Sequence, residues 1–270
     1  MRKITLDEVK ELELDMLLQF HKLCEDNHLY YTLCGGSLLG AIRHKGFIPW
    51  DDDIDVLMPR PDYERLLYNK NVNKKTIKNH VKIVSWKNDD SDMPFIKLVD
   101  TRTQIDNEYM DNDKTNKIWI DVFPIDGNPA DEKKLKKVYK NSLFLREILR
   151  RKRAKFGKGK TVFRAILKSI FIIMIKPISV KKICDAIDKN AKKYEFSECE
   201  YIGGILWGYG TQERINKNEF LTPIKVEFEG KMFNAPSNYD EYLSGLYGNY
   251  MELPPEDKRV SHEIIAYIED

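Results

Sequence analysis

The sequence has little that indicates a secreted, zinc-binding or membrane-spanning protein. Its cysteines form no Cys-x-x-Cys pair and have no histidine at zinc spacing, so we expect reduced structural thiols rather than disulfides or a zinc site; they are Cys24, Cys34, Cys184 and Cys199. The apolar run 162–175 is interrupted by Arg164 and Lys168 and is shorter than the about 20 residues that a helix needs to span a bilayer. Because the N-terminus leads directly into a charged amphipathic segment rather than a signal peptide, we expect a cytoplasmic protein.

An excess of charge of either sign is also missing. The chain has 45 Lys and Arg residues and 43 Asp and Glu residues, a net charge of +2. This is too close to neutral for bulk binding to nucleic acid, and we expect no nucleic-acid partner. The length of 270 residues and the hydrophobic share of 42% suffice for one catalytic domain with a helical appendage, or for two small domains. No internal repeat or low-complexity linker divides the sequence.

The acidic stretch 51–55 carries the strongest chemical signal. Asp53 and Asp55 lead into the apolar run 56–58, which predicts a buried strand over residues 53–58. Alternate residues of a strand point to the same face, so we expect both carboxylates to aim at one point. Two acids placed in this way repel each other unless a cation lies between them, and hard oxygen ligands suit Mg²⁺ or Mn²⁺. A solvated acidic turn is the alternative.

A glycine turn precedes the acidic stretch and strengthens this interpretation. Residues 30–34 are rich in strand-forming side chains, and Gly35 and Gly36 then allow a sharp turn and a close approach to a ligand. Ser37 stands where a helix N-cap would, at the start of the helical run 38–43. Strand, turn and helix N-terminus together predict that Gly35, Gly36 and Ser37 bind a phosphate.

Basic and aromatic residues lie between the turn and the acids. We expect Arg43, His44 and Lys45 to contact the phosphates of a nucleotide from this position. The same residues also suit a helix C-terminus, and the two interpretations are compatible. Trp50 would either stack on a base or cover the site.

Two regions of the sequence resemble the LicD family, which includes bacterial phosphocholine transferases and the fukutin-type ribitol-phosphate transferases. The first region is residues 35–58, followed by Arg60, Asp62, Tyr63 and Glu64. The second is C-terminal and comprises residues 238–243, 247–248, 250–251, 253–255 and 258–259. The glycine turn followed by an Asp-x-Asp strand is similar to the active-site pattern of the nucleotidyltransferase superfamily. The resemblance therefore implies an α+β fold, with a mixed-sheet core of the polymerase-β-like nucleotidyltransferase type and helical additions.

The resemblance also implies further site residues. In the superfamily a third carboxylate from a neighbouring strand completes the metal site and can act as a base. We choose Asp121, inside the apolar run 118–124, with Asp126 as the alternative; a buried aspartate bonded to backbone amides is the other interpretation of Asp121. Lys258 and Arg259 belong to the family-like tail and are expected near the donor phosphates, with plain surface charge as the alternative.

The expected catalytic and metal-binding set is Asp53, Asp55 and Asp121, with Mg²⁺ or Mn²⁺ as cofactor. The resemblance implies transfer of phosphocholine from CDP-choline to a hydroxyl of a cell-surface glycan, a lipid-linked glycan or a teichoic-acid precursor, with release of CMP. Choline needs an aromatic or acidic pocket for its quaternary ammonium, and the candidates are Trp50, Trp119, Trp207 and Tyr209.

Three alternative functions stay open at this point. A transferase that uses CDP-ribitol or CDP-glycerol would have the same chemistry and a more polar alcohol pocket. A nucleotidyltransferase that takes an NTP and releases pyrophosphate would use the same metal site. A non-catalytic scaffold for glycan assembly would require the loss of acidic ligands, which are all present in the sequence.

Composition suggests three parts. We expect a catalytic core over residues 1–130, a basic helical insertion over 131–200, and a C-terminal part over 201–270 that completes the substrate site. Residues 150–153 are all basic and precede an apolar run. Two interpretations stay open for this segment: a helical lid packed on the catalytic core, or a helix on an anionic membrane surface. The second would give a peripheral membrane contact through residues 150–176 at the inner face of the cell membrane.

Hydrophobic periodicity predicts the remaining elements. Helices are expected over residues 6–28, 60–69, 181–194 and 239–246. Strands are expected over 81–86, 95–99 and 118–124, and a hairpin over 226–228 and 231–233. Lys97 lies in one of these strands and would either extend to the surface or meet a phosphate in the cleft.

Overall fold

A mixed sheet organises the fold in the computed structural model, which describes residues 1–68, 72, 77–106, 115–153, 175–259 and 265–269. The main path of the sheet runs through β2 (Thr32–Leu33), β3 (Asp55–Pro59), β7 (Trp119–Asn128), β5 (Ile96–Asp100) and β4 (Val81–Val84). β3 and β7 are parallel, and the other pairs along this path are antiparallel. The expected mixed sheet is confirmed, and its relation to the polymerase-β-like fold stays a prediction.

β7 is the central strand of the sheet. Its first half lies between β3 and β5, and its second half pairs with β8 (Tyr201–Gly203), which in turn pairs with β9 (Ile215–Asn216). The strand predicted over 118–124 therefore continues to Asn128, because Asp126 finds a partner in Gly203. Through β8, the C-terminal third of the chain attaches to the same sheet as the predicted core.

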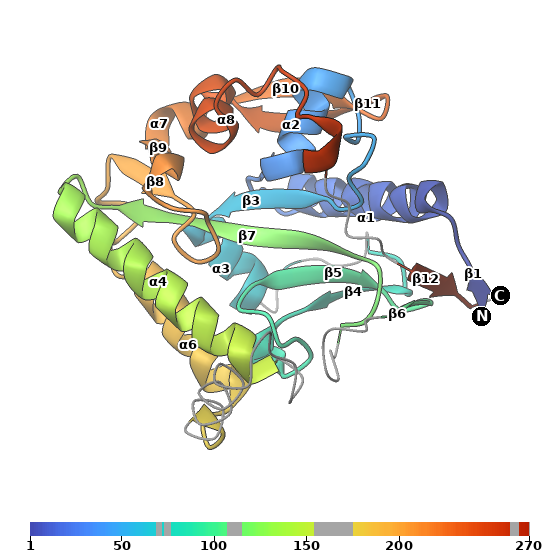
Figure 1. The fold of residues 1–270 in the computed structure, drawn as a ribbon, viewed down its shortest axis with the longest axis horizontal. Coiled ribbons are helices and arrows are strands. Elements are labelled where there is room, and N and C mark those ends of the chain that lie inside the picture. The colour runs from blue at the N-terminus through green and yellow to red at the C-terminus, as the bar shows by residue number, and fades with distance from the viewer. Residues whose placement is uncertain (69–71, 73–76, 107–114, 154–174, 260–264, 270) are drawn as a thin grey trace.

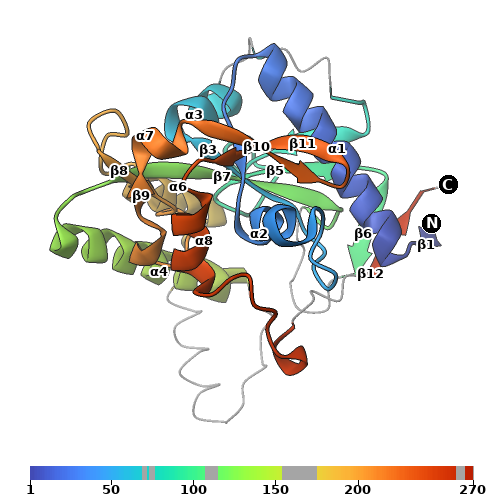
Figure 2. The ribbon, with the colours of Figure 1, turned by 90° about the horizontal axis from the view of Figure 1, so that it is seen from above.

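Helices cover the sheet on two sides. The helices among the described residues are α1 (Leu6–Asp26), α2 (Gly35–His44), α3 (Arg60–Tyr68), α4 (Glu132–Arg153), α6 (Val180–Ala191), α7 (Lys217–Phe220) and α8 (Tyr239–Tyr247). Short 3-10 helices span Trp86–Asn88, Thr211–Glu213 and Glu256–Lys258. α2 and α8 lie side by side, whereas α4 and α6 pack together at the lower left of Figure 1, away from α2 (Figure 1, Figure 2). The predicted helices are confirmed, with ends that differ by a few residues.

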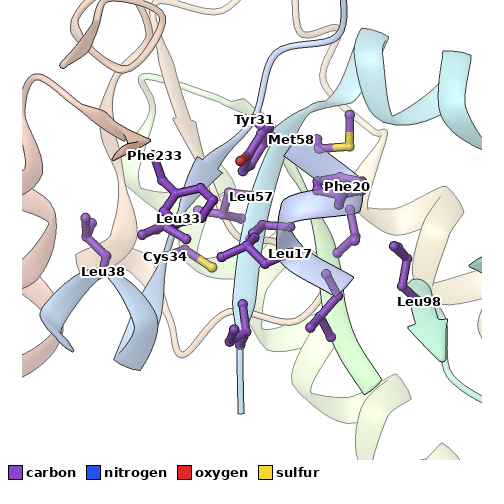
Figure 3. Packing of buried hydrophobic residues seen from close by; sticks show 14 of the residues in the cluster. Leu17, Phe20, Tyr31, Leu33, Cys34, Leu38, Leu57, Met58, Leu98 and Phe233 are labelled. Carbon is purple, nitrogen blue, oxygen red and sulfur yellow. The ribbon is translucent and has the colours of Figure 1, made fainter. Parts of the chain in front are cut away.

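α1 supplies much of the core. A capping box starts the helix: the Thr5 hydroxyl accepts the N–H of Glu8 at 3.3 Å, and the Glu8 carboxylate accepts the N–H of Thr5 at 2.8 Å. Leu17 and Phe20 on its inner face belong to the same buried cluster as Leu33, and the Phe20 ring packs edge-on against Tyr31 at 5.0 Å (Figure 3). Each fully buried side chain of this kind contributes about 1.5–3 kcal/mol, so this packing fixes the strands that carry the site residues.

Two smaller sheets complete the structure. The predicted hairpin is present as β10 (Pro223–Phe228) and β11 (Lys231–Pro236). The other sheet was not predicted, and consists of β1 (Arg2–Lys3), β12 (Ile265–Ile268) and β6 (Thr103–Asp106). It brings the two ends of the chain together (Figure 1).

None of the described helices combines the length and the apolar character that crossing a membrane requires. Residues 154–174, which form most of the segment expected to act as a lid or a membrane contact, lie outside the described residues. Both interpretations stay predictions, as does the division of the chain at residues 131 and 201.

Candidate active site

The glycine turn and the acidic strand hold each other in place. α2 begins at Gly35, and its N-cap is Cys34, whose side chain makes no capping hydrogen bond. Ser37 is therefore inside the helix and not at the predicted N-cap, because Gly35, with a φ of +52°, turns the chain earlier. The Ser37 hydroxyl instead accepts the backbone N–H of Asp55 at 2.8 Å, and the Cys34 N–H donates to the Asp55 carbonyl at 3.1 Å.

The acidic strand is shorter than predicted. β3 starts at Asp55, so Asp53 precedes the strand rather than belonging to it. The reason is that the pairing of β3 with β7 begins at Asp55, and β2 pairs only with Val56 and Leu57. Asp53 is thus held by the loop before the strand.

The predicted acids nevertheless meet in one cavity of about 710 Å³, which we call the central cavity. From the first half of the chain its lining includes Gly35, Gly36, Asp53, Asp55, Lys97, Trp119 and Asp121. From the second half its lining includes Gly204, Trp207, Gly208, Tyr209, Glu213, Tyr242 and Tyr247. The structure therefore brings the expected carboxylates and glycines together and adds residues from the C-terminal third.

Three charged residues form a row across three adjacent strands at the central cavity. Asp55 of β3 lies directly opposite Asp121 of β7, and Lys97 of β5 lies opposite Asp121 on the other side. The ammonium of Lys97 is 3.1 Å from a carboxylate oxygen of Asp121. Lys97 is buried and also lies 4.2 Å from the centre of the Trp119 ring, so it points into the cavity instead of reaching the surface.

Negative charge dominates this part of the cavity. Burial raises the pKa of Asp55 well above its usual range, and the charges of Asp53, Asp121 and Asp51 raise it further, while Lys97 opposes them. Gly36 lets another acid approach the turn, because a Cβ at this position would be 2.5 Å from a carboxylate oxygen of Asp51. The single positive charge of Lys97 does not neutralise the negative charge of these acids, and a further cation would stabilise their ionised forms.

The carboxylates fit a metal ion by donor chemistry and charge. Among the described residues, no three Asp, Glu, His or Cys side chains are close enough together to hold a metal ion by themselves. Asp121 forms an ion pair with Lys97. Mg²⁺, however, is commonly bound through one or two carboxylates, with waters and substrate phosphates as its other ligands. Asp53 and Asp55 fit that arrangement.

Asp126, the alternative to Asp121, has a structural partner. Arg60 donates to both of its carboxylate oxygens, at 2.6 and 3.0 Å, and donates to Asp188 of α6 at 2.9 Å. All three side chains are buried, and none is among the residues that line the central cavity. This network joins α3, β7 and α6, and it favours Asp121 as the cavity carboxylate.

The predicted cations lie away from the cavity lining. Arg43 donates to the backbone carbonyls of Tyr250 and Glu252 at 2.7 and 3.2 Å, which attaches α2 to the C-terminal segment. Lys45 is the exposed C-cap of α2 in a left-handed conformation, so the predicted helix C-terminus is confirmed. None of the predicted cations lines the central cavity; they are Arg43, His44, Lys45, Lys258 and Arg259.

Trp50 lies among some of these cations. The His44 ring is edge-on to it at 6.4 Å, and the Arg259 guanidinium is 4.8 Å from its ring centre. Lys258 is exposed at the end of its 3-10 helix. The expectation that these cations contact donor phosphates stays a prediction.

Sequence reasoning missed three cavity residues from the C-terminal third. Glu213 is buried, accepts the backbone N–H of Tyr209, and has a pKa that burial raises to about 7. The Tyr242 hydroxyl accepts the N–H of Gly35 at 3.4 Å, and the Tyr247 hydroxyl lies at the same turn. The family-like tail contains the two tyrosines but not Glu213, and the contact of Tyr242 with Gly35 joins residues about two hundred positions apart.

Comparison with known protein families supports the resemblance seen in the sequence. The family described as LicD/FKTN/FKRP, nucleotidyltransferase domain, matches residues 28–151. This range contains the glycine turn, Asp53, Asp55, Lys97 and Asp121. The match ends before Glu213 and the two cavity tyrosines of α8.

Curated relatives extend the match to the remainder of the chain. The lipopolysaccharide cholinephosphotransferase LicD of Haemophilus influenzae is 35% identical over 279 residues, which cover 99% of this chain and 100% of that protein. An uncharacterized protein of Rickettsia typhi is 41% identical over 56 residues, covering 20% of this chain and 18% of its own length. A protein of Rickettsia prowazekii gives the same identity over 21% of its length.

Proposed function

The chain belongs to the LicD family of transferases, and on that premise we propose that it transfers phosphocholine from CDP-choline to a hydroxyl of a cell-surface glycan, with lipopolysaccharide as the leading acceptor class. The observation that carries the proposal is the end-to-end match to a cholinephosphotransferase that acts on lipopolysaccharide. The central cavity supports it, because the row of Asp55, Asp121 and Lys97 suits reactions at phosphorus.

The reaction joins the acceptor to the phosphorus that bears choline. The acceptor hydroxyl oxygen attacks this phosphorus, the bond from phosphorus to the oxygen that bridges to CMP breaks, and CMP leaves with the bonding electrons. The hydroxyl proton passes to a carboxylate oxygen of Asp121, which Lys97 holds in position at 3.1 Å. The Gly35 turn leaves room for the donor phosphates beside Asp55.

Asp53 and Asp55 would hold Mg²⁺ or Mn²⁺ beside the donor. When bound, such an ion neutralises charge on the diphosphate and on the departing CMP. The two aspartates have a further effect of their own: their negative charge disfavours binding of a diphosphate without a cation. Metal dependence is thus expected from the charge of the site.

A donor panel tests the proposal. The protein is incubated with Mg²⁺, an acceptor lipopolysaccharide that lacks phosphocholine, and CDP-choline, CDP-ribitol, CDP-glycerol or CTP. We expect CMP and phosphocholine-modified acceptor from CDP-choline alone. Activity only with CDP-ribitol or CDP-glycerol would refute the choline donor and keep the chemistry, whereas pyrophosphate release from CTP would identify a nucleotidyltransferase. Replacing the lipopolysaccharide with a teichoic-acid precursor tests the acceptor class in the same assay.

A further inference from the structure

Two acids that line the central cavity have no role in the proposed transfer, the exposed Asp106 and the buried Glu213. Glu213 comes from the 3-10 helix Thr211–Glu213, lines the cavity, and is only 5% exposed. One of its carboxylate oxygens accepts the Tyr209 N–H. Within the described residues Glu213 forms no ion pair. The cation that influences it is Arg146, which stacks on Trp207 at 4.4 Å and donates to the Gly208 carbonyl.

The backbone around Glu213 leaves space for its carboxylate. A Cβ at Gly204 would lie 2.6 Å from the Glu213 Oε2 atom, and a Cβ at Gly208 would lie 2.5 Å from the same atom. Any side chain at either position would therefore collide with the carboxylate and displace it. Both glycines line the central cavity, so they keep a buried acid at its wall.

The tryptophans suggested by the sequence already contact cations of this chain. Lys97 lies 4.2 Å from the ring centre of Trp119, and Arg146 lies 4.4 Å from that of Trp207. Trp50 is contacted by Arg259 and does not line the cavity. A cation already over a ring repels a second one, which makes these three rings less suited to the ammonium than rings without a cation.

Tyr209 and Tyr247 are different. Both line the central cavity, and among the residues that the structure describes no Lys or Arg lies over either ring. Tyr209 is 73% exposed and directly precedes Gly210 in the loop that Glu213 holds. Burial raises the pKa of Tyr247, and the charges of Tyr209 and Asp55 raise it further.

Tyr247 connects this region to the reacting phosphate. Its hydroxyl is 3.8 Å from the point where a Cβ at Gly35 would lie, and a carboxylate oxygen of Asp55 is 3.6 Å from the same point. In phosphocholine only two carbons and an oxygen separate the nitrogen from the phosphorus. With the reacting phosphate at the Gly35 turn, as proposed above, the ammonium would lie within a few ångströms of the turn, where Tyr247 borders the cavity.

We propose that Glu213, Tyr209 and Tyr247 form the subsite that binds the quaternary ammonium of the donor and selects choline over uncharged alcohols. The proposal rests on the proposed function and specifies how it recognises its donor. A quaternary ammonium has no N–H to donate, so only negative charge and ring faces can recognise it. Glu213 supplies the charge in its ionised form, which is present from about pH 7 upward, and the tyrosines supply the faces.

Paired donors test this subsite. CDP-choline is compared with the neutral isostere in which carbon replaces the quaternary nitrogen, CDP-3,3-dimethylbutanol, in wild type, Glu213→Gln and the surface control Glu219→Gln. We expect wild type and the control to prefer CDP-choline in kcat/KM by about tenfold or more. In Glu213→Gln the ratio of kcat/KM for CDP-choline to that for the neutral donor should fall toward one, mainly through a higher KM for CDP-choline.

Each other outcome has a definite meaning. An equal loss with both donors in Glu213→Gln would overturn the subsite and make Glu213 a proton acceptor or a structural residue. Wild-type activity without preference between the donors would overturn the subsite and keep the proposed function. Wild type inactive with both donors would refute the proposed function itself.

A second pair of variants tests the subsite even if Glu213→Gln fails to fold. Tyr209→Leu removes an exposed ring and is expected to lower the preference for CDP-choline several-fold. Tyr209→Phe keeps the ring and is expected to retain the preference that Tyr209→Leu loses. Equal preference in the two variants would contradict a role for the ring face.

Discussion

Asp55 and Asp121 lie directly opposite each other on the parallel strands β3 and β7, and Lys97 is bonded to Asp121 from the next strand at 3.1 Å. A cation of the chain thus holds one of the two carboxylates, and the other has a pKa that burial and neighbouring acids raise. This difference suggests that the two carboxylates have different roles in the reaction. Asp55 and the preceding Asp53 would take a metal ion, and Asp121 would take the proton of the acceptor.

Replacing Lys97 tests the pair. Lys97→Met leaves Asp121 as an uncompensated charge in a mostly buried place, so we expect a loss of about 3 kcal/mol in the free energy of unfolding. The rate of CMP release should also fall, by a free-energy equivalent of at least the same size. Denaturant unfolding and CMP release measure the two effects, with the exposed Lys82→Met as control. Stability and rate equal to those of the control would show that the pair is unimportant.

Mg²⁺ should partly compensate for the lost lysine. If the cavity acids bind the ion, saturating Mg²⁺ should raise the unfolding midpoint of Lys97→Met more than that of wild type, because the variant has one positive charge fewer in the cavity. Thermal unfolding with Mg²⁺ and with EDTA measures this. An equal shift in both proteins would contradict a metal at these acids.

The glycine turn offers a matched pair of substitutions. Gly35 and Gly230 both have positive φ, of +52° and +69°. Alanine at either position should cost about 1 kcal/mol through backbone strain. Only Gly35→Ala should also abolish most activity, since its Cβ would occupy space beside Asp55 and the Tyr247 hydroxyl, whereas a Cβ at Gly230 meets nothing within 4 Å. Equal activity in the two variants would remove the turn from the site.

Two aspartates of β7 should separate stability from catalysis. Asp126→Asn breaks the buried network with Arg60 and Asp188, so we expect it to cost about 3 kcal/mol of stability while the folded enzyme keeps its kcat. Asp121→Asn should do the reverse and lose kcat by a factor of about 100 or more. Unfolding curves and kcat per folded molecule decide between them. The opposite pattern would make Asp126 the third carboxylate.

Glu213 should give stability a measurable pH dependence. Its pKa rises from 4.5 to about 7 on folding, because burial disfavours the charged form. Between pH 4.5 and 7 the folded chain keeps the Glu213 proton that the unfolded chain releases. The free energy of unfolding therefore falls as the pH rises through this range. The loss is on the order of 3 kcal/mol. The difference in unfolding free energy between wild type and Glu213→Gln should follow this slope, and a constant difference would refute it.

Local patterns predicted much of this molecule. The periodic apolar face of residues 6–28 predicted α1, and the Glu229–Gly230 turn between apolar runs predicted the hairpin β10–β11. The glycine turn and the Asp-x-Asp stretch located the cavity. These predictions succeeded because each depends on neighbours within a few positions, where side-chain period and backbone freedom decide the structure.

What depends on tertiary pairing could not be predicted in this way. Ser37 looked like an N-cap, but its hydroxyl binds the backbone of Asp55 in another element. The ion-pair partner of Asp121 could not be predicted from the sequence, since Lys97 becomes its neighbour only when β5 and β7 pair. Glu213 and Tyr247 reach the cavity through elements that the sequence places far from the turn.

The most direct test of the central claim is the stoichiometry of transfer by wild type, Asp55→Asn and the exposed control Asp7→Asn, with CDP-choline, a lipopolysaccharide acceptor and either Mg²⁺ or EDTA. The account predicts one CMP released for each phosphocholine bound to the acceptor in wild type and control, only with Mg²⁺, and at least about a hundredfold less in Asp55→Asn. Full transfer by Asp55→Asn, or by wild type in EDTA, would contradict it.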